Sequence, residues 1–141
     1  MKAVILDAAS LGPDVDLAPL RERVDDLVVH ARSTTHEALE RLAAAEIAIV
    51  NKVVLDAATL DALPDLRLIC VLATGTNNID MAAARRLGIA VKNVSGYGTA
   101  SVAQHTLMLL LALANRLPRY RRDVAAGRWD ESPFFLSLIH I

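Results

Sequence analysis

Residues 68–80 read Leu68-Ile69-Cys70-Val71-Leu72-Ala73-Thr74-Gly75-Thr76-Asn77-Asn78-Ile79-Asp80, and this stretch decides the fold. Its first part is a short apolar run, which predicts a buried strand, and the polar residues with a glycine that follow predict a tight turn into a helix. Buried strands followed by helices are typical of parallel sheets in α/β domains. The stretch therefore predicts a strand-to-helix connection at the carboxyl edge of a parallel sheet.

The rest of the chain repeats this pattern, because short β-rich runs alternate with alanine-rich helical runs. Thr34 or Thr35 is expected to cap one helix, and Gly88 to end another. Five strands with interleaved helices predict an α/β fold with a flavodoxin-like, doubly wound parallel sheet. We expect the strands at 2–6, 26–30, 47–50, 67–72 and 89–94, and helices at 35–45, 56–63, 79–87, about 100–116 and, beyond an interruption at Pro118, 119–127.

Composition narrows the possible partners. Fifteen basic and 16 acidic side chains give a net charge of -1, so no overall field attracts nucleic acid or an anionic membrane. The apolar stretch 107–114 is far shorter than the roughly 20 residues that span a bilayer and is interpreted as a buried helix. Cys70 stands alone inside an apolar run, which favours a small buried hydrophobe over a reactive thiol. We expect a cytoplasmic protein.

The loop from Ala73 to Asp80 is the best candidate for a binding site. Gly75 lets the backbone approach a ligand, and successive N–H groups before a helix can hold a carboxylate or a phosphate. Asn77 or Asn78 is expected to cap the following helix, and Asp80 to complement its dipole. The alternative is a connection whose glycine and asparagines serve turn geometry alone.

The pair Asn51-Lys52 is a second candidate at the same edge of the sheet, because it directly follows the expected strand 47–50, and Lys52 carries the charge. Its ammonium group could supply positive charge to the anion held by the loop. The alternative is an ordinary solvated loop lysine.

Several other features are interpreted as structural. The turn 96–101 follows a strand and opens a helix as a dinucleotide-binding loop would, but Ser101 stands in place of the third glycine. His30, His36 and His105 show neither metal-ligand spacing nor a nucleophile partner, so no metal site is expected. The arginine-rich run 116–122 is flanked by acids and is interpreted as a solvated helix face.

Four ordered motifs together resemble the D-2-hydroxyacid dehydrogenase family, most closely its glycerate dehydrogenase and hydroxypyruvate reductase branch. They are the loop 73–80, the helix start 78–84, the strand 88–91 and the segment 97–106, and the resemblance extends to about residue 135. The family implies a substrate lobe at 1–98 and, at 99–135, a hinge helix with the start of an incomplete Rossmann lobe. It also implies hydride transfer between NAD or NADP and a small 2-oxo or 2-hydroxy acid, in a protein that forms a homodimer.

The resemblance also assigns roles to individual residues. The backbone amides of Thr74 and Gly75 would bind the substrate carboxylate, and Lys52 would lie close to the substrate. Thr74 and Val102 would approach the nicotinamide side of the cofactor. The catalytic Arg, Glu and His of the family, and its main nucleotide-binding loop, are expected outside this sequence, so His105 is not assigned their role.

The last six residues, 136–141, match the in-frame translation of CTG TCT CTT ATA CAC ATC, a transposase end sequence used in preparing sequencing libraries. We therefore expect an artefactual tail on an N-terminal fragment that is inactive by itself. A second hypothesis is a stand-alone, flavodoxin-like module that binds a small anion or acts as a receiver. A receiver should carry an acid pair after its first strand, whereas Asp7 stands alone.

Overall fold

The computed structural model describes residues 1–128, which are arranged in two units. The first unit comprises Met1–Ser95 and contains the whole sheet, and the second begins at Gly96. Each unit is described by itself below. The expected extended arm at 128–133, apart from Arg128, and the expected tail at 136–141 lie outside the described residues.

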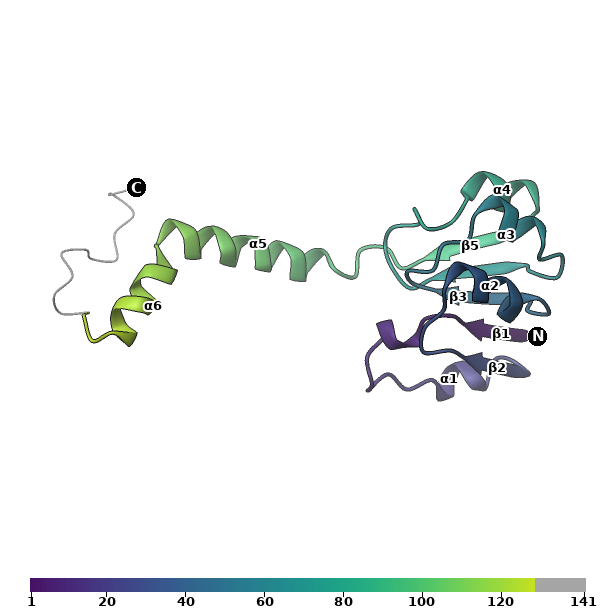
Figure 1. Ribbon diagram of the computed structural model, residues 1–141, viewed down its shortest axis with the longest axis horizontal. Coiled ribbons are helices and arrows are strands. Elements are labelled where there is room, and N and C mark those ends of the chain that lie inside the picture. The colour runs from purple at the N-terminus through teal and green to yellow at the C-terminus, as the bar shows by residue number, and fades with distance from the viewer. Residues whose placement is uncertain (129–141) are drawn as a thin grey trace. The chain divides into compact units, whose positions relative to one another are not determined.

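The first unit is built on one five-stranded sheet in which every pairing is parallel. The spatial order is β2-β1-β3-β4-β5 (Figure 1). This order confirms the predicted doubly wound, flavodoxin-like arrangement, and all five strands lie within their expected ranges. The strands are β1 (Lys2–Ile5), β2 (Asp26–Val29), β3 (Ile47–Val50), β4 (Leu68–Val71) and β5 (Ala90–Asn93).

Short helices connect the strands. Since crossovers between parallel strands are right-handed, the reversal of strand order at β1 puts α1 on one face of the sheet and the later helices on the other. The sequence did not predict the first two of these helices, because they are too short to show a helical period. The helices are η1 (Ala8–Ser10), α1 (Ala18–Arg21), α2 (Thr35–Leu42), α3 (Ala57–Asp61) and α4 (Met81–Arg86).

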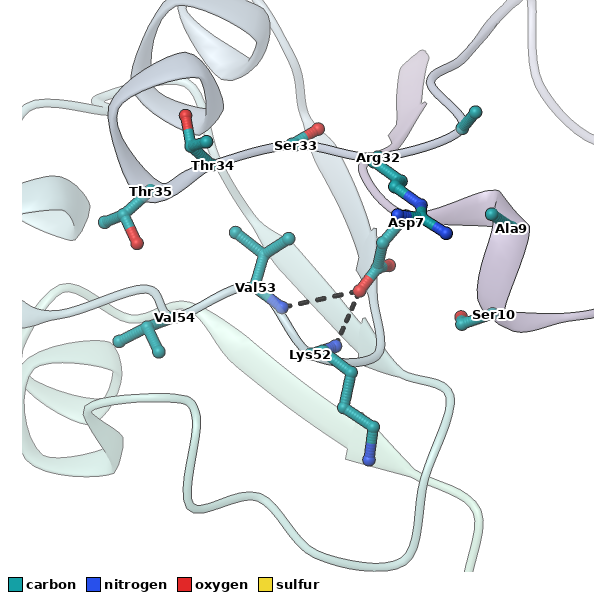
Figure 2. Close-up of a pocket in the computed structure, with 11 residues that line it drawn as sticks. Asp7, Ala9, Ser10, Arg32, Ser33, Thr34, Thr35, Lys52, Val53 and Val54 are labelled. Atoms are coloured by element: carbon teal, nitrogen blue, oxygen red, sulfur yellow. Dashed lines mark hydrogen bonds between the residues drawn. The ribbon is translucent and has the colours of Figure 1, made fainter.

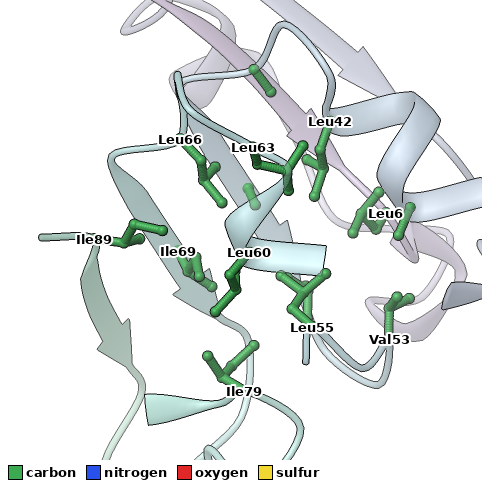
Figure 3. Close-up of a cluster of buried hydrophobic side chains, with 14 of the residues drawn as sticks. Leu6, Leu42, Val53, Leu55, Leu60, Leu63, Leu66, Ile69, Ile79 and Ile89 are labelled. Carbon is green, nitrogen blue, oxygen red and sulfur yellow. The ribbon is translucent and has the colours of Figure 1, made fainter. Parts of the chain in front are cut away.

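The main core lies between the sheet and helices α2, α3 and α4. Leu42 and Leu60 from two of these helices are almost completely buried beside strand residues such as Ile69 (Figure 3). Leu55 and Ile79 belong to the connections that follow β3 and β4, and they are buried in the same cluster. The core therefore fixes the loops at the carboxyl edge of the sheet as well as the strands.

Side-chain caps define where the helices begin. Thr34 accepts a hydrogen bond from the backbone N–H of Glu37, whose carboxylate accepts in turn from the N–H of Thr34, so the predicted threonine cap is confirmed as a full capping box. The predicted cap of α4 was wrong. Asp80, not Asn77 or Asn78, accepts from the N–H groups of Ala82 and Ala83. A carboxylate at this position satisfies two end amides and complements the helix dipole.

Cys70 is less buried than its apolar run predicted. It is half-buried, and partial burial raises the pKa of its thiol. The reason is the alternation of side chains along β4, which turns Ile69 and Val71 into the main core and Cys70 to the opposite face.

The second unit contains α5 (Thr99–Ala114) and α6 (Leu117–Ala125). The predicted interruption at Pro118 was misplaced by two residues. Arg116 makes the break with a left-handed backbone (φ 52°), and Pro118 lies in the first turn of α6, where its missing N–H costs nothing. The interpretation of 107–114 as a buried helix was also wrong for this structure: Leu107, Leu110 and Leu113 are exposed, because α6 covers only part of α5.

Within residues 1–128, no helix has both the length and the apolar character needed to cross a membrane. The same residues hold no group of three or more histidine, cysteine or acidic side chains arranged to bind a metal ion.

Two leucines of α2 test this core. Leu42 is 1% exposed and Leu39 is 36% exposed on the same helix. Replacing Leu42 by Ala should lower the free energy of unfolding by about 2–5 kcal/mol, because it leaves a cavity. Leu39→Ala, the matched control, should cost less than about 1 kcal/mol. Urea unfolding followed by circular dichroism measures both, and equal losses would contradict the described core.

Candidate functional site

The loop after β4 is held rigidly on one side by the connection between β3 and α3. Leu55 and Ile79 form an isolated parallel bridge, in which the N–H of Leu55 donates to the carbonyl of Asn78 (2.9 Å) and the N–H of Asp80 donates to that of Leu55 (3.0 Å). The side-chain amide of Asn78 donates to the carbonyl of Val53 (3.0 Å). Asn78 thus joins two loops instead of capping a helix.

The other side of the loop is fastened to the end of β5. The hydroxyl of Thr74 donates to the carbonyl of Val94 (3.1 Å), and the side-chain amide of Asn93 donates to the carbonyl of Thr74 (2.7 Å). The N–H of Val94 donates to Ala73 (3.1 Å). These three bonds join residues 73–74 to the end of β5.

The amides between these two attachments remain available. Within the described part of the chain, the backbone N–H groups of residues 74–78 donate to no protein acceptor. Thr74, Gly75 and Asn77 are also exposed. A row of free N–H groups beside a buried strand end can bind an anion through several hydrogen bonds.

The backbone conformation of Gly75 does not demand glycine, and the space beside it is tight. Its φ lies outside the left-handed region, but a Cβ at this position would stand 3.0 Å from the side-chain oxygen of Asn77. A residue with a Cβ would therefore require the side chain of Asn77 to shift by a few tenths of an ångström.

Lys52 faces the same place as the loop. A pocket of about 260 Å³ is lined by Lys52 and Gly75, together with Asn51, Val54, Ala73, Asn77 and Asn78. The structure therefore brings together the lysine after β3 and the glycine after β4, as the parallel arrangement of these neighbouring strands requires. One cation and several free amides at a single small pocket are suited to an anion of the size of a carboxylate.

Asp7 organises the turn that carries Lys52, a role that sequence reasoning missed. Asp7 is 7% exposed, and its carboxylate accepts from the backbone N–H groups of Asn51 (2.9 Å) and Lys52 (2.6 Å), with a longer bond from Val53 (3.4 Å; Figure 2). The signal that could have found it is its place directly after β1, which pairs with β3. Asp7 satisfies the amides of this turn, whereas those of the loop 74–78 stay free.

A larger pocket of about 580 Å³ lies on the other side of Lys52 (Figure 2). Asp7, Lys52 and Val54 line it from the ends of β1 and β3, and Ser10 and Arg32 line it from the segments after β1 and β2. Arg32 was not singled out in the sequence, because a lone exposed arginine carries no pattern.

The three histidines of the described residues, His30, His36 and His105, line neither of these pockets. His30 follows β2 and is half-buried, and burial lowers its pKa below the ordinary value of 6.5, with the positive charge of Arg41 acting in the same direction. His36 lies in the first turn of α2 and is exposed, and His105 lies on α5 in the second unit.

Val102, the remaining predicted site residue, belongs to the second unit. It lies in the first turns of α5 and is 66% exposed.

Comparison with known families identifies the chain. The sequence model for the catalytic domain of the D-isomer specific 2-hydroxyacid dehydrogenases matches residues 3–135, nearly the whole chain. The chain belongs to this family. The resemblance found in the sequence is thereby confirmed.

Curated relatives include the two activities of the expected branch. Glycerate dehydrogenase of Methylorubrum extorquens is 45% identical over 102 residues, which cover 72% of this chain and 32% of the relative. Hydroxypyruvate reductase of Blautia hydrogenotrophica is 34% identical over 137 residues, which cover 94% of this chain and 42% of the relative. The chain thus spans less than half the length of these relatives.

Solved structures agree on the fold. The TT0316 protein of Thermus thermophilus matches with a TM-score of 0.75 and 28% identity, over 97% of this chain and 44% of that protein. D-2-hydroxyisocaproate dehydrogenase matches with a TM-score of 0.73 and 18% identity, over 96% of this chain and 42% of that protein. The second likeness concerns the fold alone, because its identity is low.

The role of Asp7 can be tested by removing its charge. Asp7→Asn replaces one acceptor oxygen by a donor that faces backbone amides, so the free energy of unfolding should fall by about 1–3 kcal/mol. Asp65→Asn makes the same change of charge at an exposed position and should be nearly neutral. Chemical denaturation of both variants provides the measurement, and an Asp7 variant as stable as the control would show that the amides of the turn need no carboxylate.

Proposed function

We propose that this chain is the substrate lobe of an NAD(P)-dependent oxidoreductase that interconverts a small 2-oxo acid and the corresponding D-2-hydroxy acid. Hydroxypyruvate with D-glycerate, or glyoxylate, is the proposed substrate. The observation that carries the proposal is the row of free amides at 74–78 beside Lys52, in a chain of this family. The names of the curated relatives support the choice of acid.

The chain's own residues would bind and orient the acid. The N–H groups of Thr74 and Gly75 would donate to the substrate carboxylate, and the ammonium group of Lys52 would add a positive charge on its far side. Because the loop is fixed at both ends, the carboxylate would be held in one orientation. Binding energy of this kind places the neighbouring C2 atom for reaction.

NAD(P)H, when bound, supplies the hydride that C2 of the oxo acid accepts, while the carbonyl oxygen takes up a proton to become the hydroxyl group. Thr74 of the first unit and Val102 of the second are each exposed, and each is proposed to approach the nicotinamide ring of the bound cofactor. The proton donor, the carboxylate that orients it and the substrate-binding arginine are proposed to lie outside this sequence, as is the main nucleotide-binding loop.

The proposed organisation assigns residues 1–98 to the substrate lobe and 99–135 to a hinge helix with the start of the nucleotide lobe. The compact unit that ends at Ser95 supports this division, as does the left-handed backbone of Gly96 (φ 77°) at the start of the next unit. We place the protein in the cytoplasm.

A stand-alone module that binds a small anion is the second candidate. It is favoured by one observation: the loop, Lys52 and their pocket are complete within the first unit. The receiver version of this candidate is not favoured, because the carboxylate of Asp7 is already occupied by backbone amides.

Kinetics of the full-length protein test the dehydrogenase. It should oxidise NADH or NADPH when hydroxypyruvate or glyoxylate is the substrate. The loss of absorbance of the reduced cofactor measures the rate. Lys52→Met should lower kcat/KM by about 10- to 100-fold, the effect of losing one charged hydrogen bond. Lys92→Met, at an exposed position on β5, is the matched control and should leave kcat/KM unchanged.

Two outcomes would reject the dehydrogenase. One is a gene whose continuation encodes neither a G-x-G-x-x-G loop nor a downstream Arg, Glu and His. The other is a full-length protein that shows no turnover, together with tight binding of glycerate to the chain alone as measured by calorimetry. That combination would favour the stand-alone binding module.

We further propose that the full-length protein is a homodimer and that the apolar side chains of α5 are covered in it. Leu110 and Leu113 are 61% and 73% exposed in the described residues, and a contiguous apolar surface of this kind promotes association. The chain expressed alone should therefore aggregate, and the double substitution Leu110→Glu with Leu113→Glu should reduce the aggregation. Light scattering makes the comparison, and monodisperse monomers of the unsubstituted chain would contradict the prediction.

A further inference from the structure

The end of β5 holds the two peptide groups whose N–H groups are proposed to bind the substrate carboxylate. The first group joins Ala73 to Thr74, and its carbonyl accepts a hydrogen bond from the N–H of Val94 (3.1 Å). The second joins Thr74 to Gly75, and its carbonyl accepts from the side-chain amide of Asn93 (2.7 Å). Both bonds act on the carbonyl oxygens, while the two N–H groups have no protein acceptor among residues 1–128.

The direction of each N–H follows from the direction of its carbonyl. Both peptide bonds are trans, and in a trans peptide the carbonyl and the N–H lie in one plane and point in opposite directions. Because both carbonyls point toward β5, the N–H groups of Thr74 and Gly75 point away from it. β3 lies on the other side of β4, and the turn after β3 carries Lys52, which lines the small pocket together with Gly75. The end of β5 therefore directs both amides toward the side on which the lysine lies.

This arrangement differs from that of a continuing strand. Along an extended strand, successive N–H groups alternate between the two neighbouring strands, whereas the N–H groups of Thr74 and Gly75 lie on one side. Successive N–H groups on one side form a concave site for an anion. The shape of this site thus depends on one backbone bond and one side-chain bond from β5.

The side chain of Asn93 has the chemistry that this position needs. A carbonyl oxygen only accepts hydrogen bonds, so its partner must be a donor, as the amide nitrogen of asparagine is and an ionised carboxylate is not. A hydrogen bond to the carbonyl also polarises the peptide group, which makes the N–H on its other side a stronger donor. Asn93 can therefore both direct and strengthen the N–H of Gly75.

We propose that Asn93 is a positioning residue of this site: by holding the carbonyl of Thr74, its side-chain amide directs the N–H of Gly75 at the substrate carboxylate. The inference rests on the function proposed above and adds a residue to it. That N–H would donate to the carboxylate equally in the bound substrate and in the transition state. Loss of the Asn93 bond therefore weakens substrate binding more than it slows hydride transfer.

Kinetics of the full-length protein test this role. Asn93→Ala should raise KM for hydroxypyruvate about 3- to 10-fold, the effect of losing one neutral hydrogen bond. The value of kcat should change less than about twofold, because binding and not the chemical step is affected. KM for NADH and the Tm of the protein should stay unchanged, whereas a merely structural role would alter Tm and all the kinetic constants together.

Two further variants complete the comparison. Asn93→Asp keeps the size of the side chain but replaces the donor by an acceptor and adds a negative charge, so KM for hydroxypyruvate should rise at least about tenfold. Asn115→Ala is the matched control, because the side-chain amide of Asn115 also donates to a backbone carbonyl, that of Leu111 (2.9 Å), but in the second unit. This control should leave KM for hydroxypyruvate unchanged.

The inference would be overturned by an unchanged KM for hydroxypyruvate in Asn93→Ala or in Asn93→Asp. A rise in that KM accompanied by equal changes in kcat and in KM for NADH would overturn it as well.

Binding of oxamate separates this inference from the dehydrogenase proposal. Oxamate has the shape of a small 2-oxo acid, but its carbonyl belongs to an amide and is not reduced. Calorimetry of the full-length protein, with and without NADH, should show Kd for oxamate raised in Asn93→Ala by the same factor as KM for hydroxypyruvate. If the protein reduces no 2-oxo acid, the proposed function fails, and the calorimetry still decides whether Asn93 supports carboxylate binding. If reduction occurs and Kd does not respond to Asn93→Ala, the inference about Asn93 alone is wrong.

Discussion

The hydrogen bonds between the carboxylate of Asp7 and the backbone of the turn after β3 fix the conformation of that turn at the carboxyl edge of the sheet. Parallel strands end at one edge, and each following turn presents N–H groups that need an acceptor. Asp7 supplies one buried acceptor to the amides of the β3 turn. That turn carries Lys52 and Val54, which line two pockets, whereas the amides of residues 74–78 after β4 have no protein acceptor in the described part of the chain.

The sheet itself followed directly from the sequence, since short apolar runs alternating with helical runs allow few arrangements other than parallel strands with crossovers. Thr34 was recognised as a cap because a threonine before a helical period with Glu37 three positions later is a local pattern. Asp80 was missed as a cap because its position depends on a contact between distant parts of the chain and not on a local pattern. The loop is pinned by Leu55 and Ile79, a contact between segments far apart in sequence, and this places the helix start after Asp80.

In the candidate site, too, features set by local sequence were predicted and features set by long-range contacts were not. Lys52 and Gly75 were expected at one edge because each follows a strand, and they line one pocket. The structural role of Asp7 and the position of Arg32 were not predicted, because single charged residues have no periodicity, and only the strand order brings them beside Lys52. The apolar stretch of α5 indicates that this surface is covered in the full-length protein, but it does not indicate which element covers it. The roles of Thr74, Gly75, Lys52 and Val102 toward substrate and cofactor stay predictions.

The hydrogen bond from the hydroxyl of Thr74 to the carbonyl of Val94 determines how this side chain can interact with a ligand. A hydroxyl group has one hydrogen, and that of Thr74 is given to the carbonyl of Val94. Toward anything bound at the loop, the oxygen of Thr74 therefore acts only as an acceptor, while its backbone N–H acts only as a donor. A carboxylate oxygen can accept a hydrogen bond from the backbone N–H of Thr74 but is repelled by its side-chain oxygen. An alcohol O–H or a carboxamide N–H can donate to that side-chain oxygen. Thr74 thus presents one hydrogen-bond donor, its backbone N–H, and one acceptor, its side-chain oxygen. A ligand, or a pair of ligands, that uses both must place an acceptor at the N–H and a donor at the oxygen.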